Sequence, residues 1–243
     1  MTPHYNVVIV TPGDKIYMNY ASSLVDTIQY FNDNGVTYKW LNHYSPHIAD
    51  ARHNLLFGES QTSMYDRVSL FHTPKSHIAQ LFQGTMTYDQ IVWIDNDVSW
   101  TVDQMVALLA HQEEVVTGAY RLAHPELLSV FLKNADLHPS TVLLTTHELD
   151  NLNKEKLYEV ACCGMGFLKV RSGVFESMKA PIFTESVIDI PYTRNNETCH
   201  YATNHNYQED ISFCFRVQEL GCKIYFDPKI ILSHYKRMML THP

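Results

Sequence analysis

Two aspartates, Asp95 and Asp97, follow the apolar run Ile-Val-Trp-Ile at residues 91–94. Such a run predicts a buried strand, and the carboxyl ends of strands in α/β sheets are where ligands bind. Alternate residues of an extended segment point the same way, so Asp95 and Asp97 can converge on one hard cation while Asn96 faces elsewhere. A divalent metal that bridges to a diphosphate is the expected occupant. The alternative is an acidic pair that caps a helix or faces solvent.

Three later places carry residue types that suit catalysis. Gly164 and Gly166 are spaced so that a ligand can approach the backbone, Glu209 and Asp210 open a predicted helix, and His234 ends a late strand. Each also has a purely structural reading. The glycines can mark a bulge, the acids are common at helix N-termini, and the histidine can be an exposed strand end.

Strands and helices are expected to alternate up to residue 120. The strands are predicted at 7–10, 36–41, 91–94 and 114–120, and the helices at 19–32, 48–57 and from 101 onward. Thr101 and Gln104 form a capping-box pattern at the start of the last helix. The first strand stops at Thr11, Pro12 and Gly13, which places a loop where ligands bind. The alternation favours a parallel, open α/β sheet.

The order beyond residue 120 is less regular. The predicted elements are a strand at 166–170, helices at 172–178 and 209–220, and strands at 223–226 and 230–232. A loop-rich stretch is expected at 122–158, a long functional loop at 181–208, and an insertion at 58–77.

Composition limits the class of protein. The chain has 243 residues, 45% of them hydrophobic, and a net charge of −8 with no block of basic residues, so one domain is expected and nucleic-acid binding is disfavoured. No signal peptide and no apolar run of about 18 residues is present, which predicts a soluble cytoplasmic protein without a membrane partner. The five cysteines are expected to be reduced thiols.

The order of these features resembles the nucleotide-sugar-dependent glycosyltransferases of the GT-A fold, especially their small phage and bacterial members. The most specific part is Tyr-Gln-Glu-Asp-Ile-Ser-Phe-Cys-Phe-Arg at 207–216, followed by Glu-Leu-Gly-Cys-Lys-Ile at 219–224 and Ser-His at 233–234. Ala-Arg-His-Asn at 51–54 and Val-Thr-Gly-Ala-Tyr at 116–120 support it. The insertion at 58–77 departs from the pattern.

The resemblance implies an α/β fold of the GT-A, Rossmann-like type. It has a mostly parallel open sheet flanked by helices and a smaller C-terminal portion on the acceptor side. Residues 1–243 would form a single domain, with a nucleotide-sugar-binding half at 1–120 and an acceptor half at 121–243. The implied reaction moves a hexose from UDP-glucose or UDP-galactose to a hydroxyl acceptor, either a saccharide or a small molecule. The location would be the cytoplasm, that of the host if the chain is viral.

The resemblance also assigns roles to residues. The cofactor would be Mn²⁺ or Mg²⁺, bound by Asp97 and His234, with Asp95 on the ribose or a metal-bound water; an imidazole ligand favours Mn²⁺. Asp210 would be the base in an inverting enzyme, with Glu209 beside it. For the donor, Thr11, Pro12 and Gly13 would face the nucleobase, and Arg52 would lie near the ribose or diphosphate. The Asp95-Asn96-Asp97 segment also belongs to the implied donor site. Gly164 and Gly166 would lie near the sugar, and Lys236 and Arg237 over the phosphates.

Three other functions stay open. Phage relatives also glycosylate hydroxymethylated DNA bases, so nucleic acid is a possible acceptor that the acidic charge disfavours. A metal-dependent nucleotidyltransferase shares the paired carboxylates, but residues 11–15 are a poor match to its glycine-rich basic loop. A zinc-binding module would use some of the 14 histidines, but no Cys/His quartet with zinc-site spacing supports it.

Overall fold

The structure is a computed structural model. It describes residues 2–58, 80–133, 143–178, 182–183 and 208–236, together with the backbone of 189–194 and 197–202. The predicted insertion at 58–77 and the candidate phosphate-binding residue Arg237 therefore lie outside the described residues, apart from residue 58.

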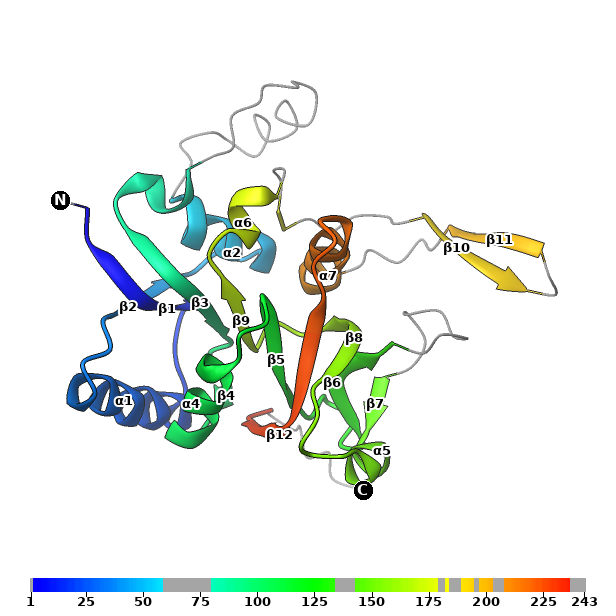
Figure 1. The fold of residues 1–243 in the computed structure, drawn as a ribbon, viewed down its shortest axis with the longest axis horizontal. Coiled ribbons are helices and arrows are strands. Elements are labelled where there is room, and N and C mark those ends of the chain that lie inside the picture. The colour runs from blue at the N-terminus through cyan, green and yellow to red at the C-terminus, as the bar shows by residue number, and fades with distance from the viewer. Residues whose placement is uncertain are drawn as a thin grey trace, which may run out of the picture.

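A mixed ten-stranded sheet runs through the described residues (Figure 1). Its order is β2-β1-β3-β9-β5-β12-β8-β6-β7, and β4 pairs with β12. The strands are β1 His4–Pro12, β2 Tyr38–His43, β3 Thr87–Ile94, β4 Val98–Ser99, β5 Val115–Tyr120, β6 Leu127–Leu132, β7 Leu143–Thr145, β8 Tyr158–Cys163, β9 Phe167–Arg171 and β12 Ile224–His234. A separate hairpin is formed by β10 Asp189–Arg194 and β11 Glu197–Ala202.

Strand directions explain where the candidate site forms. The strands β2, β1, β3, β5 and β12 point the same way, and β9 runs against them between β3 and β5. The carboxyl ends of β1, β3 and β12 are therefore at one edge of the sheet. The open α/β architecture is the one that the sequence predicts, and strands from both sides of residue 120 share this sheet.

Helices cover both faces of the sheet (Figure 1). The helices are α1 Met18–Asp33, α2 Ile48–Phe57, α4 Val102–Ala110, α5 Thr146–Asn151, α6 Val174–Ser177 and α7 Glu209–Glu219, and a 3₁₀ turn spans Leu81–Gly84. Apolar residues of α1 and α4 form one core cluster, and those of α2, α6 and α7 form the other. The side chains of 91–94 alternate between the two clusters and are all buried, which explains the continuous apolar run in the sequence.

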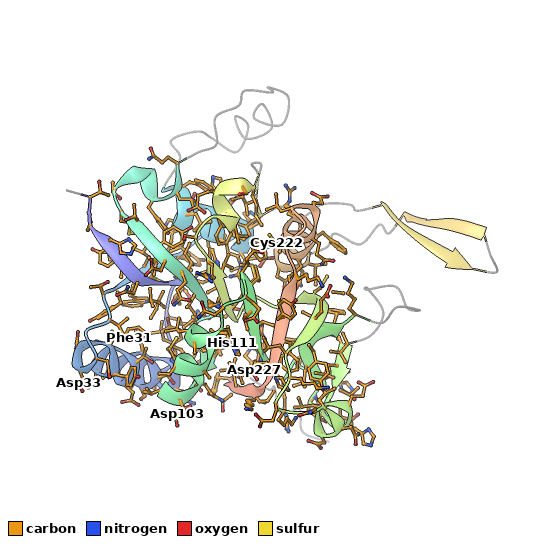
Figure 2. The ribbon with its side chains drawn as sticks, in the orientation of Figure 1. Phe31, Asp33, Asp103, His111, Cys222 and Asp227 are labelled. Carbon is orange, nitrogen blue, oxygen red and sulfur yellow. The ribbon has the colours of Figure 1, made fainter. Side chains whose placement is uncertain are left out.

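Helix α4 anchors β12, the strand that carries His234. Gln104 donates from Nε2 to the Ile231 carbonyl at 2.7 Å, and His111 Nε2 lies 2.8 Å from Asp227 Oδ2 (Figure 2). The predicted capping box of Thr101 and Gln104 is present. One helix and the residue that follows it therefore hold β12 at two points, Asp227 and Ile231.

Three regions differ from the sequence-based expectation. The stretch at 122–158 contains β6, β7 and α5 and the start of β8, and the predicted loop at 181–208 contains the β10–β11 hairpin. The two predicted late strands are one strand, β12, whose register against β5 shifts between Phe226 and Ile231. Pro228 lies in that shift; a proline has no N–H to give to a ladder, and an irregular register accommodates it. No helix in the described part of the chain is long and apolar enough to cross a membrane.

Candidate active site

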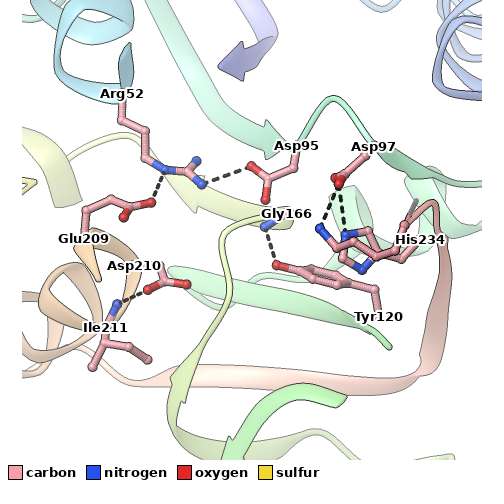
Figure 3. Close-up of polar contacts among 10 residues, drawn as sticks. Arg52, Asp95, Asp97, Tyr120, Gly166, Glu209, Asp210, Ile211 and His234 are labelled. Atoms are coloured by element: carbon pink, nitrogen blue, oxygen red, sulfur yellow. Dashed lines mark hydrogen bonds and ion pairs between the residues drawn. The ribbon is translucent and has the colours of Figure 1, made fainter. Parts of the chain in front are cut away.

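Asp95 and Asp97 leave the end of β3 in different directions. Residues 95–98 form a turn closed by the Val98 amide and the Asp95 carbonyl at 3.1 Å. Because the segment turns rather than staying extended, Asp95 points toward Arg52 and Asp97 toward His234 (Figure 3). The expectation that both carboxylates converge on one cation is therefore wrong for this structure. Among the described residues, no cluster of three His, Cys, Asp or Glu side chains could hold a metal.

Asp97 and His234 come together through strand pairing. His234 of β12 lies opposite Val98 of β4, and the Tyr235 amide donates to the Asp97 carbonyl at 2.8 Å. The Nε2 of His234 is 3.3 Å from Asp97 Oδ2, and both side chains are mostly buried. Lys236, which is half-exposed, reaches the same oxygen with Nζ at 2.9 Å. Burial opposes ionisation of Asp97, but hydrogen bonds from His234 and Lys236 outweigh it and lower the pKa of the carboxyl.

The Asp97 and His234 pair fits a divalent metal as a two-residue donor set. The Nδ1 of His234 lies 2.6 Å from the Arg121 carbonyl, to which it donates. That contact leaves Nε2, which faces Asp97, as the nitrogen that can bind a metal. One carboxylate and one imidazole suit Mn²⁺, and water or phosphate oxygens would complete the coordination.

Arg52 is buried rather than poised over a ligand. Its side chain is 3% exposed; Nη2 contacts Asp95 Oδ1 at 3.0 Å and Nε contacts Glu209 Oε1 at 3.1 Å. Its guanidinium carbon also lies 5.4 Å from the centroid of the Trp93 ring. Burial lowers the pKa of Arg52, but the neighbouring carboxylates raise it by more than burial lowers it. The side chain is therefore permanently charged. The sequence placed Arg52 at the ribose or diphosphate, whereas two of its nitrogens are already paired within the protein.

Asp210 lies in the first turn of α7 and is largely buried. Its Oδ1 accepts a hydrogen bond from the Ile211 amide at 2.7 Å (Figure 3). Burial raises the pKa of Asp210 to about 7, aided by the charges of Glu209 and Cys214, although Arg52 opposes the shift. The N-terminal end of a helix favours the ionised form of an aspartate, but desolvation of Asp210 exceeds that effect.

Tyr120 explains both glycines between β8 and β9. A Cβ on Gly164 would lie 2.3 Å from the Tyr120 hydroxyl, and one on Gly166 would lie 2.6 Å from the ring. The Gly166 amide donates to that hydroxyl at 3.2 Å, and the ring packs edge-on against His234 with centroids 4.8 Å apart. The space that the glycines leave is occupied by Tyr120, so the approach of a sugar is not needed to explain them. The role of Tyr120 was missed because no motif links residues 46 positions apart.

The loop after β1 lies beside the Asp95–Asp97 turn. Gly13 has a φ of +145°, and a Cβ there would lie 2.4 Å from Asn96 Nδ2. Asn96 donates from Nδ2 to the Lys15 carbonyl at 2.7 Å, so it holds the loop against the end of β3. Thr11 is fully buried, and its hydroxyl contacts Tyr20 and accepts from Trp40 Nε1 at 3.1 Å. Pro12 ends β1 opposite His43 of β2.

An aromatic pair borders the site and was also missed by sequence reasoning. The rings of Tyr17 and Tyr235 lie 4.6 Å apart between centroids, and Tyr235 is 46% exposed. The Tyr17 amide donates to the Asn96 carbonyl at 3.2 Å. Both rings are thus attached to the turn that carries Asp97.

Comparison with known proteins found many solved structures similar to this chain, including the two below. No family model and no curated protein matches the chain. The crystal structure of A197 from STIV has 16% sequence identity and a TM-score of 0.47, with 98% of each chain covered. The crystal structure of GalNAc-T7 with UDP, GalNAc and Mn²⁺ has 9% identity and a TM-score of 0.48; 96% of this chain and 44% of that chain are covered. The case for a function therefore rests on the residues of the site.

Proposed function

We propose that this chain is a metal-dependent glycosyltransferase of the GT-A type, which transfers a hexose from a UDP-sugar to a hydroxyl acceptor. The observation that carries the proposal is the pairing of Asp97 with His234 at 3.3 Å, where the turn before β4 meets the end of β12. A carboxylate and an imidazole at the carboxyl edge of an α/β sheet form a site suited to a metal and a charged ligand.

The donor side needs positive charge near a departing diphosphate. A divalent metal held by Asp97 and His234 would supply this as a Lewis acid. Lys236 is the chain's own cation here, because its Nζ contacts Asp97 and its half-exposed stem allows it to reach a phosphate. Asn96 and Gly13 hold the neighbouring loop in place for the nucleoside.

The acceptor side needs a group that can take a proton. Ile211 holds Oδ1 of Asp210, which leaves Oδ2 to accept the proton of an acceptor hydroxyl. A general base works best when its pKa lies near the working pH, and the pKa of Asp210 is raised to about 7. This assignment belongs to an inverting reaction; in a retaining one, Asp210 would orient the hydroxyl.

A binding experiment tests the donor half of the proposal. Calorimetry should show UDP binding that depends on Mn²⁺, and Asp97→Ala should weaken it by about 100-fold or more, because the diphosphate loses its counter-charge. Asp103→Ala is the matched control, since Asp103 is an exposed aspartate on α4 (Figure 2). UDP affinity that is unchanged by a chelator or by Asp97→Ala would contradict the metal assignment.

An acceptor screen separates the remaining functions. UDP release from UDP-glucose or UDP-galactose should rise with a saccharide or small hydroxyl acceptor, and the net charge of −8 favours these over hydroxymethylcytosine DNA. Turnover on that DNA alone would identify a DNA glycosyltransferase. Release of inorganic diphosphate from a nucleoside triphosphate and a sugar phosphate would instead identify a nucleotidyltransferase.

A further inference from the structure

Three parts of the chain meet at the guanidinium of Arg52. Arg52 belongs to α2, its partner Asp95 follows β3, and its partner Glu209 begins α7, 157 positions further along the sequence (Figure 3). Arg52 and Glu209 are 3% and 7% exposed at their side chains. A buried ion pair of this kind holds its elements in one arrangement, because separating the charges leaves one of them desolvated and unpaired.

The guanidinium faces more negative groups than it can neutralise. Arg52 contacts Asp95 and Glu209 directly, while Asp210 next to Glu209 gets its hydrogen bond from the Ile211 amide instead. The remaining nitrogen of Arg52, Nη1, is buried and has no hydrogen-bond partner among the described residues. The planar guanidinium of Arg52 thus fixes the carboxylates of Asp95 and Glu209. Asp210 is the carboxylate that is left free to exchange a proton.

We propose that Arg52 is a positioning residue, which clamps Asp95 to Glu209 and thereby holds Asp210 in place relative to the Asp97–His234 pair. Arg52 thus provides a direct side-chain link between the donor-side turn and the acceptor-side helix. This inference rests on the proposed function for its catalytic consequence, but the clamp itself can be measured in the unfolding of the protein.

The geometry requires arginine rather than any cation. Two nitrogens of one rigid plane reach two carboxylates on different elements, and a lysine ammonium is a point charge that cannot reproduce this fork. A displacement of about 1 Å between reacting groups lowers a rate by about 100-fold. Arg52→Lys should therefore lower turnover by about that factor, with UDP affinity in the presence of Mn²⁺ unchanged within about threefold, since neither Asp97 nor His234 is touched.

Chemical rescue distinguishes a positioning role from general damage to the fold. Arg52→Ala leaves a buried space between two carboxylates, and guanidinium at concentrations far below those that unfold proteins should restore part of its turnover, whereas sodium or urea should not. Arg171→Lys is the matched control, because Arg171 is exposed and donates to the Gln112 carbonyl away from the site. It should behave as wild type.

A double-mutant cycle on unfolding covers the case in which Arg52→Ala does not fold. Arg52→Lys and Glu209→Gln should be non-additive in their free energies of unfolding, because each removes the same contact. Additive effects would overturn the clamp, and so would full turnover in Arg52→Lys. A parallel loss of UDP affinity would make Arg52 a donor-binding residue. If wild-type protein does not bind UDP with Mn²⁺, the proposed function fails, while the cycle still decides the clamp.

Discussion

Asp210 and Asp97 are both aspartates of the candidate site, but their surroundings shift their pKa values in opposite directions. Asp97 is stabilised as a carboxylate by His234 and Lys236, whereas burial and the adjacent Glu209 favour the protonated form of Asp210. Two carboxyl groups held in different charge states are suited to different tasks. Asp97 can bind a cation at neutral pH, and Asp210 can take up a proton.

Replacing Asp210 with asparagine should separate binding from turnover. We expect Asp210→Asn to keep UDP affinity with Mn²⁺ while lowering transfer on the order of 100-fold or more, because the amide cannot accept the proton. Calorimetry and the rate of transfer are the two measurements. Full activity would remove Asp210 from catalysis, and an equal loss of UDP affinity would place it on the donor side.

The pH dependence of the wild-type protein should follow the charge of Asp210. Its pKa is raised to about 7 in the folded protein, well above that of an ordinary aspartate, so the base form increases as pH rises through 7. The rate of transfer should rise as pH rises through 7, and the rate of Asp210→Asn should not show this rise.

The free energy of unfolding should depend on the protonation of Asp210 in the opposite direction. A raised carboxyl pKa favours folding at low pH, and this stabilisation is lost as pH rises through 7. Thermal unfolding at pH 6 and pH 8 tests it: Asp210→Asn should flatten the decline.

Single residues were predictable from the sequence where a local rule fixes them. Asp97 follows a buried strand and His234 ends another, so their meeting at one edge follows from the α/β pattern. The partners of Arg52 were not predictable, because Glu209 is brought to it by the packing of α7 and not by spacing. In the structure Arg52 is a salt-bridged helix residue.

Helix α4 acts as a support for the site through its first turn. Thr101→Ala should destabilise the protein by about 1 kcal/mol, as the loss of an N-cap does. Gln104→Ala should cost roughly 2 kcal/mol, because Gln104 also loses its hydrogen bond to the Ile231 carbonyl of β12. Denaturant unfolding measures both. Equal losses in the two variants would show that the contact with β12 adds nothing.

The turn between β8 and β9 depends on Tyr120 packing against two glycines. Gly166→Ala should destabilise the protein by about 1 to 3 kcal/mol, since the new methyl group overlaps the ring, and should also weaken Mn²⁺ binding by displacing Tyr120 from His234. Denaturant unfolding and metal titration measure the two effects. In a Gly166→Ala, Tyr120→Leu double variant, stability should recover in part. If Gly166→Ala binds Mn²⁺ as wild type does, Tyr120 does not position His234.

At the scale of elements, the sequence predicts best where hydrophobic periodicity is long. The helix at 48–57 and the capping box at 101–104 are confirmed. Strand β7 was missed because it has three residues, and β10 because it carries proline and polar residues that are typical of loops. Strand β6 was missed although five of its six residues are apolar. The turn at 95–98 was read as extended because the strand pattern before it was continued through these residues, although Asp and Asn favour turns.

The whole molecule has one sheet with a core cluster on each face, and the candidate site contacts both layers. Tyr120 belongs to the cluster under α1 and α4, whereas Arg52 lies on α2 and Glu209 on α7, the helices of the opposite face. A ligand bound at this edge would therefore stabilise both layers together. Unfolding should be cooperative, and its midpoint should report ligand binding.

Binding of UDP and Mn²⁺ should raise the melting temperature of the full chain. A ligand at 100 times its Kd adds about 2.7 kcal/mol to the free energy of unfolding. For a chain of this size roughly 2–4 °C accompanies each kcal/mol, which gives a shift of about 5–10 °C. The controls are UDP alone, Mn²⁺ alone, and UDP with Mn²⁺ in the presence of a chelator. Asp97→Ala should abolish the shift in melting temperature that UDP and Mn²⁺ cause together. If the pair raises the melting temperature of Asp97→Ala as much as that of wild type, the ligand binds somewhere other than the Asp97–His234 edge.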